Sequence, residues 1–129
     1  MNLKAKGTVA ENQLLNMFWQ KGWACLRSAG SGAMHHPGPD LLVGNKLRRL
    51  AIECKTCKGI VKYLSKDDIA QLREFSLIFG AEQWFAIKFA KLDWYFISSE
   101  DLIITNSGFK ADIKLIKKKG VLFDELIAF

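Results

Sequence analysis

Two carboxylates and one amine form the most suggestive chemical pattern in the sequence. Asp40 follows Pro39, and further along the chain an acid and a lysine flank one residue in Glu53-Cys54-Lys55. Two hard oxygen ligands suit Mg²⁺ or Mn²⁺. Phosphodiester hydrolysis needs a cation that activates a water molecule and positive charge beside the pentavalent phosphorus. These residues therefore predict metal-assisted cleavage of a phosphodiester, with Lys55 orienting or polarising the attacking water.

The acid and lysine pattern alone is weak evidence. With 13 acids and 15 lysines among 129 residues, about 1.5 chance occurrences are expected, and the chain has two. The second, Asp112-Ile113-Lys114, has no Pro-Asp pair on a predicted neighbouring strand. The simplest alternative for Glu53 and Lys55 is an exposed ion pair at a sheet edge, which contributes ~0 to 1 kcal/mol.

Charge is distributed unevenly along the chain. Residues 1–66 contain 11 basic and 3 acidic side chains, whereas residues 67–129 contain 8 and 10. A basic surface attracts phosphate backbones through counterion release, although ordinary solvated lysines would give the same count. The three acids of the basic half are Glu11, Asp40 and Glu53, and each opposes phosphate binding unless a cation neutralises it. The charge pattern thus favours a nucleic-acid partner and a metal site.

The three cysteines allow a different kind of site. Cys54 and Cys57 form a C-x-x-C pair, and zinc or redox chemistry could recruit His35 and His36 as further ligands. No second C-x-x-C pair is present, and in an extended strand the two Cα atoms would lie about 10 Å apart. We therefore expect Cys25 and Cys54 to be core residues rather than metal ligands.

The elements that must position these residues can be predicted from local signals. Thr8 and Glu11 have the spacing of a capping box, which predicts that a helix begins there and ends at Gly22. Glu11 then has an alternative role as a capping carboxylate. The next segments are predicted to be a strand at 23–28, a loop at 29–39 and two strands at 40–44 and 48–55. A tight turn at Gly44-Asn45-Lys46 would pair the last two strands and bring Asp40 near Glu53.

The C-terminal half continues the alternation of helices and strands. Ser65 and Asp68 predict the start of a second helix that ends at Gly80, with Ile69, Leu72, Ser76 and Phe79 on its apolar stripe. Further elements are predicted as strands at 83–90 and 94–98, a helical turn at 99–101, a strand at 109–116 and an apolar tail at 121–129. This order predicts an α/β fold with a central mixed β-sheet flanked by α-helices. At 129 residues, we expect one nuclease domain spanning 1–129.

Several short motifs, in this order and spacing, make residues 4–98 resemble the archaeal-type Holliday junction resolvases of the PD-(D/E)xK nuclease superfamily. The motifs are Lys6-Gly7, Glu11, Arg27-Ser28-Ala29-Gly30-Ser31, Pro39-Asp40-Leu41-Leu42, Ile52-Glu53-Cys54-Lys55, Tyr63-Leu64-Ser65-Lys66, Glu74-Phe75, Phe79-Gly80 and Trp94-Tyr95-Phe96. The resemblance implies a restriction-endonuclease-like core. It also implies a Mg²⁺-dependent homodimer, with Mn²⁺ as a substitute, that recognises four-way DNA junctions by shape and nicks two opposed strands.

The resemblance also implies roles for individual residues. Asp40 and Glu53 would hold the metal, Lys55 would assist the nucleophile, Glu11 would support the metal cluster, and Arg27 and Ser31 would lie near the scissile backbone. Two positions depart from the family pattern, because Asn12 replaces an arginine and Cys54 replaces an aliphatic residue. The first departure weakens a phosphate contact or leaves it to Lys4 or Lys6.

The substrate class and location follow as expectations. We expect Lys4, Lys6, Arg27, Lys62 and Lys66 to contact phosphates rather than bases, because a junction recognised by shape offers no fixed base code. No apolar run approaches the length of about 18 residues that spans a bilayer, so we expect a cytoplasmic protein that works on chromosomal DNA without a membrane or a small-molecule substrate. Two alternatives stay open: a related nuclease that cuts duplex or flap DNA, and a DNA-binding module without catalysis.

Overall fold

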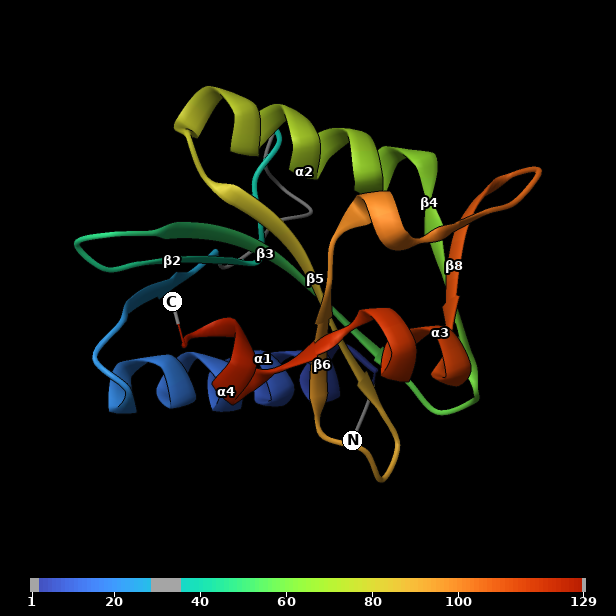
Figure 1. Ribbon diagram of the computed structural model, residues 1–129, viewed down its shortest axis with the longest axis horizontal. Helices are drawn as coiled ribbons and strands as arrows, with labels where there is room; N and C mark the ends of the chain where they lie inside the picture. Colours follow the sequence, from blue (N-terminus) through green and yellow to red (C-terminus); the bar gives the residue numbers. More distant parts are fainter. Residues whose placement is uncertain (1–2, 29–35, 129) are drawn as a thin grey trace.

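The computed structural model describes residues 3–28 and 36–128, with the side chains of residues 3–6 excepted. Figure 1 shows a central sheet between helical layers. The elements are α1 (Leu3–Gln20), β1 (Ala24–Arg27), β2 (Leu41–Gly44), β3 (Arg49–Cys57), β4 (Val61–Ser65), α2 (Lys66–Phe79), β5 (Glu82–Phe89), β6 (Trp94–Ile97), η2 (Ser99–Asp101), β7 (Ile103–Ile104), β8 (Gly108–Asp112), α3 (Ile113–Lys119), β9 (Val121–Leu122) and α4 (Phe123–Leu126).

The main sheet has six strands in the order β1-β2-β3-β5-β6-β9. β3 and β5 pair in parallel, and the other neighbours pair antiparallel. A parallel pair needs a long crossover, and α2 lies on that connection. α1 and α4 lie along one side of the sheet and α2 along the other (Figure 1). The predicted α/β fold with a mixed sheet between helices is confirmed.

The core has two parts, one on each face of the main sheet. Leu50 and Ile52 of β3 pack into the cluster that contains Phe18 of α1, whereas Ala51 packs into the cluster that contains Ile69 and Leu72 of α2. This alternation follows the period of two in a β-strand, and burial on both faces is typical of a parallel pair covered by helices. Within the part of the chain that the structure describes, no helix combines the length and hydropathy of a membrane span.

The hairpin of β2 and β3 forms as predicted. The Asn45 side chain accepts hydrogen bonds from the backbone N–H groups of Leu47 and Arg48, both at 2.8 Å, and so holds the turn. The register places Leu41 opposite Ile52. Because the strands are antiparallel, the residue before Leu41 lies opposite the residue after Ile52, which sets Asp40 across from Glu53.

The first helix begins earlier than predicted. α1 starts at Leu3 and includes Thr8, so Glu11 lies inside the helix and is not the carboxylate of an N-terminal capping box. Leu14 and Phe18 anchor the helix in the first core cluster, and the helical conformation extends from there back past the capping signal. The end of the helix agrees with the prediction, since Gly22 adopts a positive φ of 84°.

The second helix matches its prediction closely. Ser65 and Asp68 form the full capping box, and Gly80 ends the helix in the left-handed conformation. Ile69, Leu72 and Ser76 are buried, but Phe79 is 46% exposed and does not belong to the buried stripe.

The chain after Ser98 differs from the prediction in part. The helical turn at Ser99–Asp101 is present, but the strand predicted at 109–116 ends at Asp112. There the Asp112 side chain accepts a hydrogen bond from the N–H of Leu115 at 2.7 Å and starts α3. β8 joins β4 and β7 in a second, three-stranded sheet that the sequence did not predict.

Arg48 links the hairpin to β5 and α4. Its guanidinium donates to both carboxylate oxygens of Glu82, at 2.7 and 2.9 Å, and to the carbonyl of Leu126 at 2.6 Å. The hydrogen bond from Arg48 is the main reason that the pKa of Glu82 lies below its usual value of 4.5, with burial opposing it. A lowered carboxyl pKa stabilises the native state above the unfolded-state pKa, and this contribution disappears as the pH falls through the folded-state pKa.

We expect Glu82→Gln to destabilise the protein by about 1 to 2 kcal/mol at pH 7, because the charge-assisted pair is lost at a partly exposed site. At pH 3, below the usual carboxyl pKa of 4.5, the difference should shrink, because the stabilisation that comes from a lowered pKa decreases as the pH falls below the unfolded-state pKa. Thermal unfolding at both pH values measures the effect. If Glu82→Gln lowered the stability equally at pH 3 and pH 7, the prediction would be wrong.

Candidate active site

Asp40 and Glu53 come together at the end of the β2–β3 hairpin. The Asp40 Oδ2 atom accepts a hydrogen bond from the backbone N–H of Cys54 at 2.8 Å, which fixes the carboxylate against β3. Burial and then the charge of Asp40 raise the pKa of Glu53 to about 8, and a hydrogen bond between the two carboxyl groups adds to the shift while Lys55 opposes it. The two acids therefore share one site on the same face of the sheet.

This pair fits a divalent cation. Two carboxyl groups in contact cannot both ionise freely, and a cation bound between them would remove that conflict. Among residues 3–28 and 36–128, no group of three or more His, Cys, Asp or Glu side chains gathers into a metal site. Mg²⁺ commonly binds through one or two carboxylates and completes its shell with water and substrate phosphate. The donors present thus suit Mg²⁺ rather than a metal that needs a closed protein shell.

Lys55 lies between two acids. Its Nζ atom is 3.6 Å from Glu53 Oε2 and 3.3 Å from Asp68 Oδ1. Burial lowers the pKa of Lys55, but the charges of Glu53 and Asp68 outweigh it, so the pKa lies above the usual 10.5. The amine is therefore a cation beside the carboxylate pair, where it can orient water or stabilise negative charge.

Asp68 is a residue of this site that the sequence analysis missed. It was identified as a capping residue of α2, and that role is confirmed. Its contact with Lys55 depends on how α2 packs on β3, which a capping signal does not reveal. The available signal was that Asp68 is the acid of the capping box of α2, and only the short strand β4 separates this helix from the strand that carries Lys55.

Glu11 lies near the pair but is held by another partner. Its Oε2 atom is 3.8 Å from Nη1 of Arg27, and Arg27 Nε also donates to the Asn12 side chain at 3.2 Å. Burial and the charge of Asp40 raise the pKa of Glu11, while Arg27 lowers it. The charge of Asp40 thus acts on Glu11, but among the described residues Glu11 does not form a group of three acids with Asp40 and Glu53. Asn12, the first departure from the family pattern, orients Arg27.

The expected phosphate contacts are described only in part. Arg27 and Lys62 are half-buried, and Lys66 is exposed at the start of α2. Ser31 and the side chains of Lys4 and Lys6 lie outside the described residues. Arg27 lies beside Glu11 in space, and Lys66 begins the helix that carries Asp68.

The cysteine alternative does not fit the fold. Cys54 packs against the first core cluster and Cys57 against the second, so the two thiols lie on opposite faces of the sheet. Burial and nearby acids raise the pKa of Cys54 well above 9, and burial raises the pKa of Cys25 to about 12. Neither thiol is a ready thiolate ligand at neutral pH. His35 lies outside the described residues.

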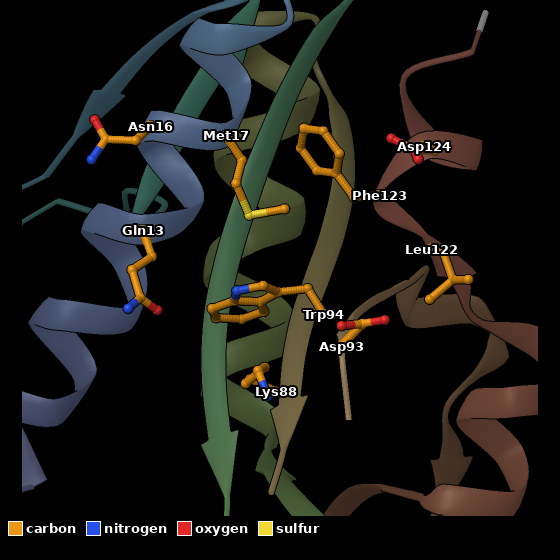
Figure 2. Close-up of a pocket in the computed structure, with 9 residues that line it drawn as sticks. All are labelled: Gln13, Asn16, Met17, Lys88, Asp93, Trp94, Leu122, Phe123 and Asp124. Carbon is orange, nitrogen blue, oxygen red and sulfur yellow. The ribbon is translucent and has the colours of Figure 1, made fainter. Parts of the chain in front are cut away.

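Figure 2 shows a pocket of about 580 Å³ at another place, on the side of the sheet covered by α1. Gln13 and Met17 of α1, Trp94 of β6 and Leu122 of β9 contribute to its walls. None of the predicted site residues lines it. The candidate active site therefore lies at the end of the hairpin and is separate from this pocket.

Comparisons with known proteins identify the family of this chain. The family model of the archaeal Holliday junction resolvase (Hjc) matches residues 2–129. The chain is 42% identical over 110 residues to the crossover junction endodeoxyribonuclease Hjc of Archaeoglobus fulgidus, covering 85% of this chain and 81% of that protein. It is also 42% identical over 84 residues to the Methanocaldococcus jannaschii protein of the same name, covering 65% and 59%.

A solved structure extends the likeness to three dimensions. The structure of Archaeoglobus fulgidus Hjc, described as a Holliday junction resolvase, superimposes with a TM-score of 0.87 at 38% identity, covering 93% of this chain and 98% of that one. The fold is therefore restriction-endonuclease-like. With its sequence and its fold in agreement, this chain belongs to the archaeal Holliday junction resolvase (Hjc) family.

Proposed function

We propose that this chain is a structure-selective endodeoxyribonuclease that resolves four-way DNA junctions by cutting two opposed strands. The observation that carries the proposal is the arrangement on β3: Asp40 is hydrogen-bonded to the N–H of Cys54, its charge raises the pKa of the neighbouring Glu53, and the Lys55 ammonium lies 3.6 Å from Glu53, in a member of the resolvase family. Its relatives are named crossover junction endodeoxyribonucleases. We further infer that residues 1–129 act as one nuclease domain, since a single sheet joins β1 to β9.

Each residue has a part that follows from its geometry. Asp40, fixed by the N–H of Cys54, and Glu53 would hold Mg²⁺, or Mn²⁺ in its place. When bound, the ion would polarise a phosphate oxygen and lower the pKa of water. Lys55 keeps its charge and directs an N–H toward the attacking water. Glu11 supports the site electrostatically and holds Arg27, which is then positioned to contact the DNA backbone near the scissile phosphate.

The basic residues are proposed to provide affinity for DNA without selecting its base sequence. Arg27, Lys62 and Lys66 would contact phosphates, and Lys4, Lys6 and Ser31 are proposed to do the same. Binding through phosphates weakens steeply with salt because counterions are released. Shape selection then requires that two such surfaces meet the junction at once.

The test is a cleavage assay with a synthetic four-way junction, a flap and a linear duplex of matched sequence, each with Mg²⁺ or with EDTA. We expect paired nicks in opposed strands of the junction, only with Mg²⁺. Equal cutting of duplex or flap would favour a related nuclease of different substrate class. Salt-sensitive binding without cutting in Mg²⁺ or Mn²⁺ would favour a DNA-binding module.

A homodimer is part of this proposal, because two symmetric cuts call for two active sites related by a two-fold axis. The structure offers an exposed apolar patch for it, formed by Leu26 on the edge strand β1 and by Leu77, Ile78 and Phe79 at the end of α2. Leu26 and Phe79 line one depression of about 360 Å³, so the two parts of the patch are continuous. Phe75 stacks on Phe79, with ring centroids 5.4 Å apart. Such a patch on a small protein is typical of an interface.

Ile78→Glu should convert the dimer into a monomer. Ile78 is 81% exposed and one helical turn from Phe75, so a buried charge without a partner would lower dimer affinity by about a hundredfold or more. The matched control is Ile104→Glu, the same substitution at a 79% exposed residue of β7. Light scattering after gel filtration measures the mass. A dimeric Ile78→Glu variant would place the interface elsewhere.

A further inference from the structure

The contacts of Lys55 lead to one inference about a residue outside the proposed metal pair. We propose that Asp68 is a positioning residue, which holds the Lys55 amine in place for catalysis from the first turn of α2. This inference rests on the proposed nuclease function. Asp68 would then have two roles: it caps α2, and it positions Lys55 for the reaction.

The carboxylate of Asp68 is divided between two partners. Its Oδ1 atom lies 3.3 Å from Lys55 Nζ, and its Oδ2 atom accepts a hydrogen bond from the backbone N–H of Ser65 at 3.0 Å. Lys55 and Asp68 are both largely shielded, with side-chain exposures of 22% and 27%. A shielded ion pair is screened less by water and salt than one on an open surface. The contact therefore limits the positions that the amine can adopt.

Asp68 is itself held rigidly. Its backbone N–H donates to the Ser65 hydroxyl at 3.0 Å, which completes the capping box. The next residue, Ile69, and Leu72 anchor the helix in the second core cluster. Because both ends of the contact belong to packed elements, β3 and α2, the position of the amine follows the position of the helix. Rigid support of this kind is what a catalytic group requires.

The second partner of Lys55 explains why this support matters. Glu53 Oε2 lies 3.6 Å from the amine, and Glu53 is also a proposed metal ligand. Without Asp68, Lys55 would have Glu53 as its near acidic partner, and a close ion pair there would compete with the metal. An ammonium has three donors. With Asp68 and Glu53 as partners, one N–H stays available for the attacking water or the phosphate.

The simpler alternative is that Asp68 only caps the helix. The neighbouring acid, Asp67, distinguishes the two roles because it is also in the first turn of α2 and is exposed. Asp68→Asn and Asp67→Asn change the net charge equally and remove one acid from the same helix terminus. Asn at position 68 can still accept from Ser65 N–H and so keeps the cap. Only Asp68→Asn removes the ion pair with Lys55.

The experiment measures single-turnover cutting of a four-way junction at saturating Mg²⁺, together with junction affinity in EDTA. We expect Asp68→Asn to lower the maximal rate by about ten- to a hundredfold with affinity unchanged, since a displaced catalytic group costs this much. Asp67→Asn should stay within about twofold of wild type. Asp68→Glu, which retains a carboxylate, should recover part of the rate.

Stability is measured alongside by thermal unfolding, with Ser65→Ala as a second variant. That change removes the hydroxyl of the cap but leaves the Asp68 carboxylate and its hydrogen bond from the Ser65 N–H, so stability should fall while the rate per folded molecule falls much less than in Asp68→Asn. If wild type cuts junctions and Asp68→Asn matches Asp67→Asn, the inference is wrong. A rate that tracks stability through all the variants would also overturn it. Failure of wild type to cut would instead reject the proposed function.

Discussion

Asp40→Asn and Glu53→Gln should each abolish cleavage of a four-way junction and leave junction binding intact. Each change keeps the shape of the side chain but replaces a charged ligand by a neutral amide, so the pair no longer holds a divalent ion firmly. We expect a loss of at least about a thousandfold in rate, equivalent to about 4 kcal/mol of transition-state stabilisation. Single-turnover cleavage and gel-shift binding of the same junction measure the two quantities.

These variants should remain folded, because each removes one of two like charges that oppose each other within a half-buried pair. The matched control is Asp112→Asn in Asp112-Ile113-Lys114, the second acid and lysine motif. Asn is as good an N-cap as Asp, so α3 should be preserved and cutting should be normal. Retained cutting by both site variants would reject the assignment of Asp40 and Glu53.

Phe18→Ala should lower the free energy of unfolding by about 3 to 5 kcal/mol, the usual result of removing a buried aromatic ring. Phe18 is fully buried at the centre of the α1 side of the core. Its ring packs edge-on against Phe123, Trp23 and Phe96, with centroid distances of 5.0, 6.2 and 6.4 Å. No rearrangement of one neighbour could fill the space that all three border. Denaturant unfolding followed by circular dichroism measures the change.

The control for this prediction is Tyr63→Ala, which removes an aromatic ring that is 67% exposed on β4. It should cost no more than about 1 kcal/mol. Because α1 also carries Glu11, a partly unfolded Phe18→Ala protein should lose the contact between Glu11 and Arg27 as well. A loss below about 1 kcal/mol in Phe18→Ala would mean that α1 contributes little to the core.

Short-range signals in the sequence correctly predicted the elements that carry the candidate site residues. The turn after Gly44 depends on the side chain of Asn45 and its near neighbours, and once it forms, pairing of the strands brings Asp40 to Glu53. The capping box of Ser65 and Asp68 is local in the same way. The family resemblance was also carried by the order of such motifs. These features are encoded within a few residues, so the sequence alone was sufficient to find them.

Other features depend on residues that are distant in the chain. α1 begins before its capping signal, and Phe18 of this helix packs against β6 and α4, which holds the helix where Glu11 lies beside Arg27 instead of at a helix end. The contact of Asp68 with Lys55 exists because α2 covers β3, and the two thiols of the C-x-x-C pair point into different cores because β3 is buried on both faces. The sequence determined the hairpin and the acids on it. Only tertiary packing, which brings elements from different parts of the chain together, decided which charges surround them.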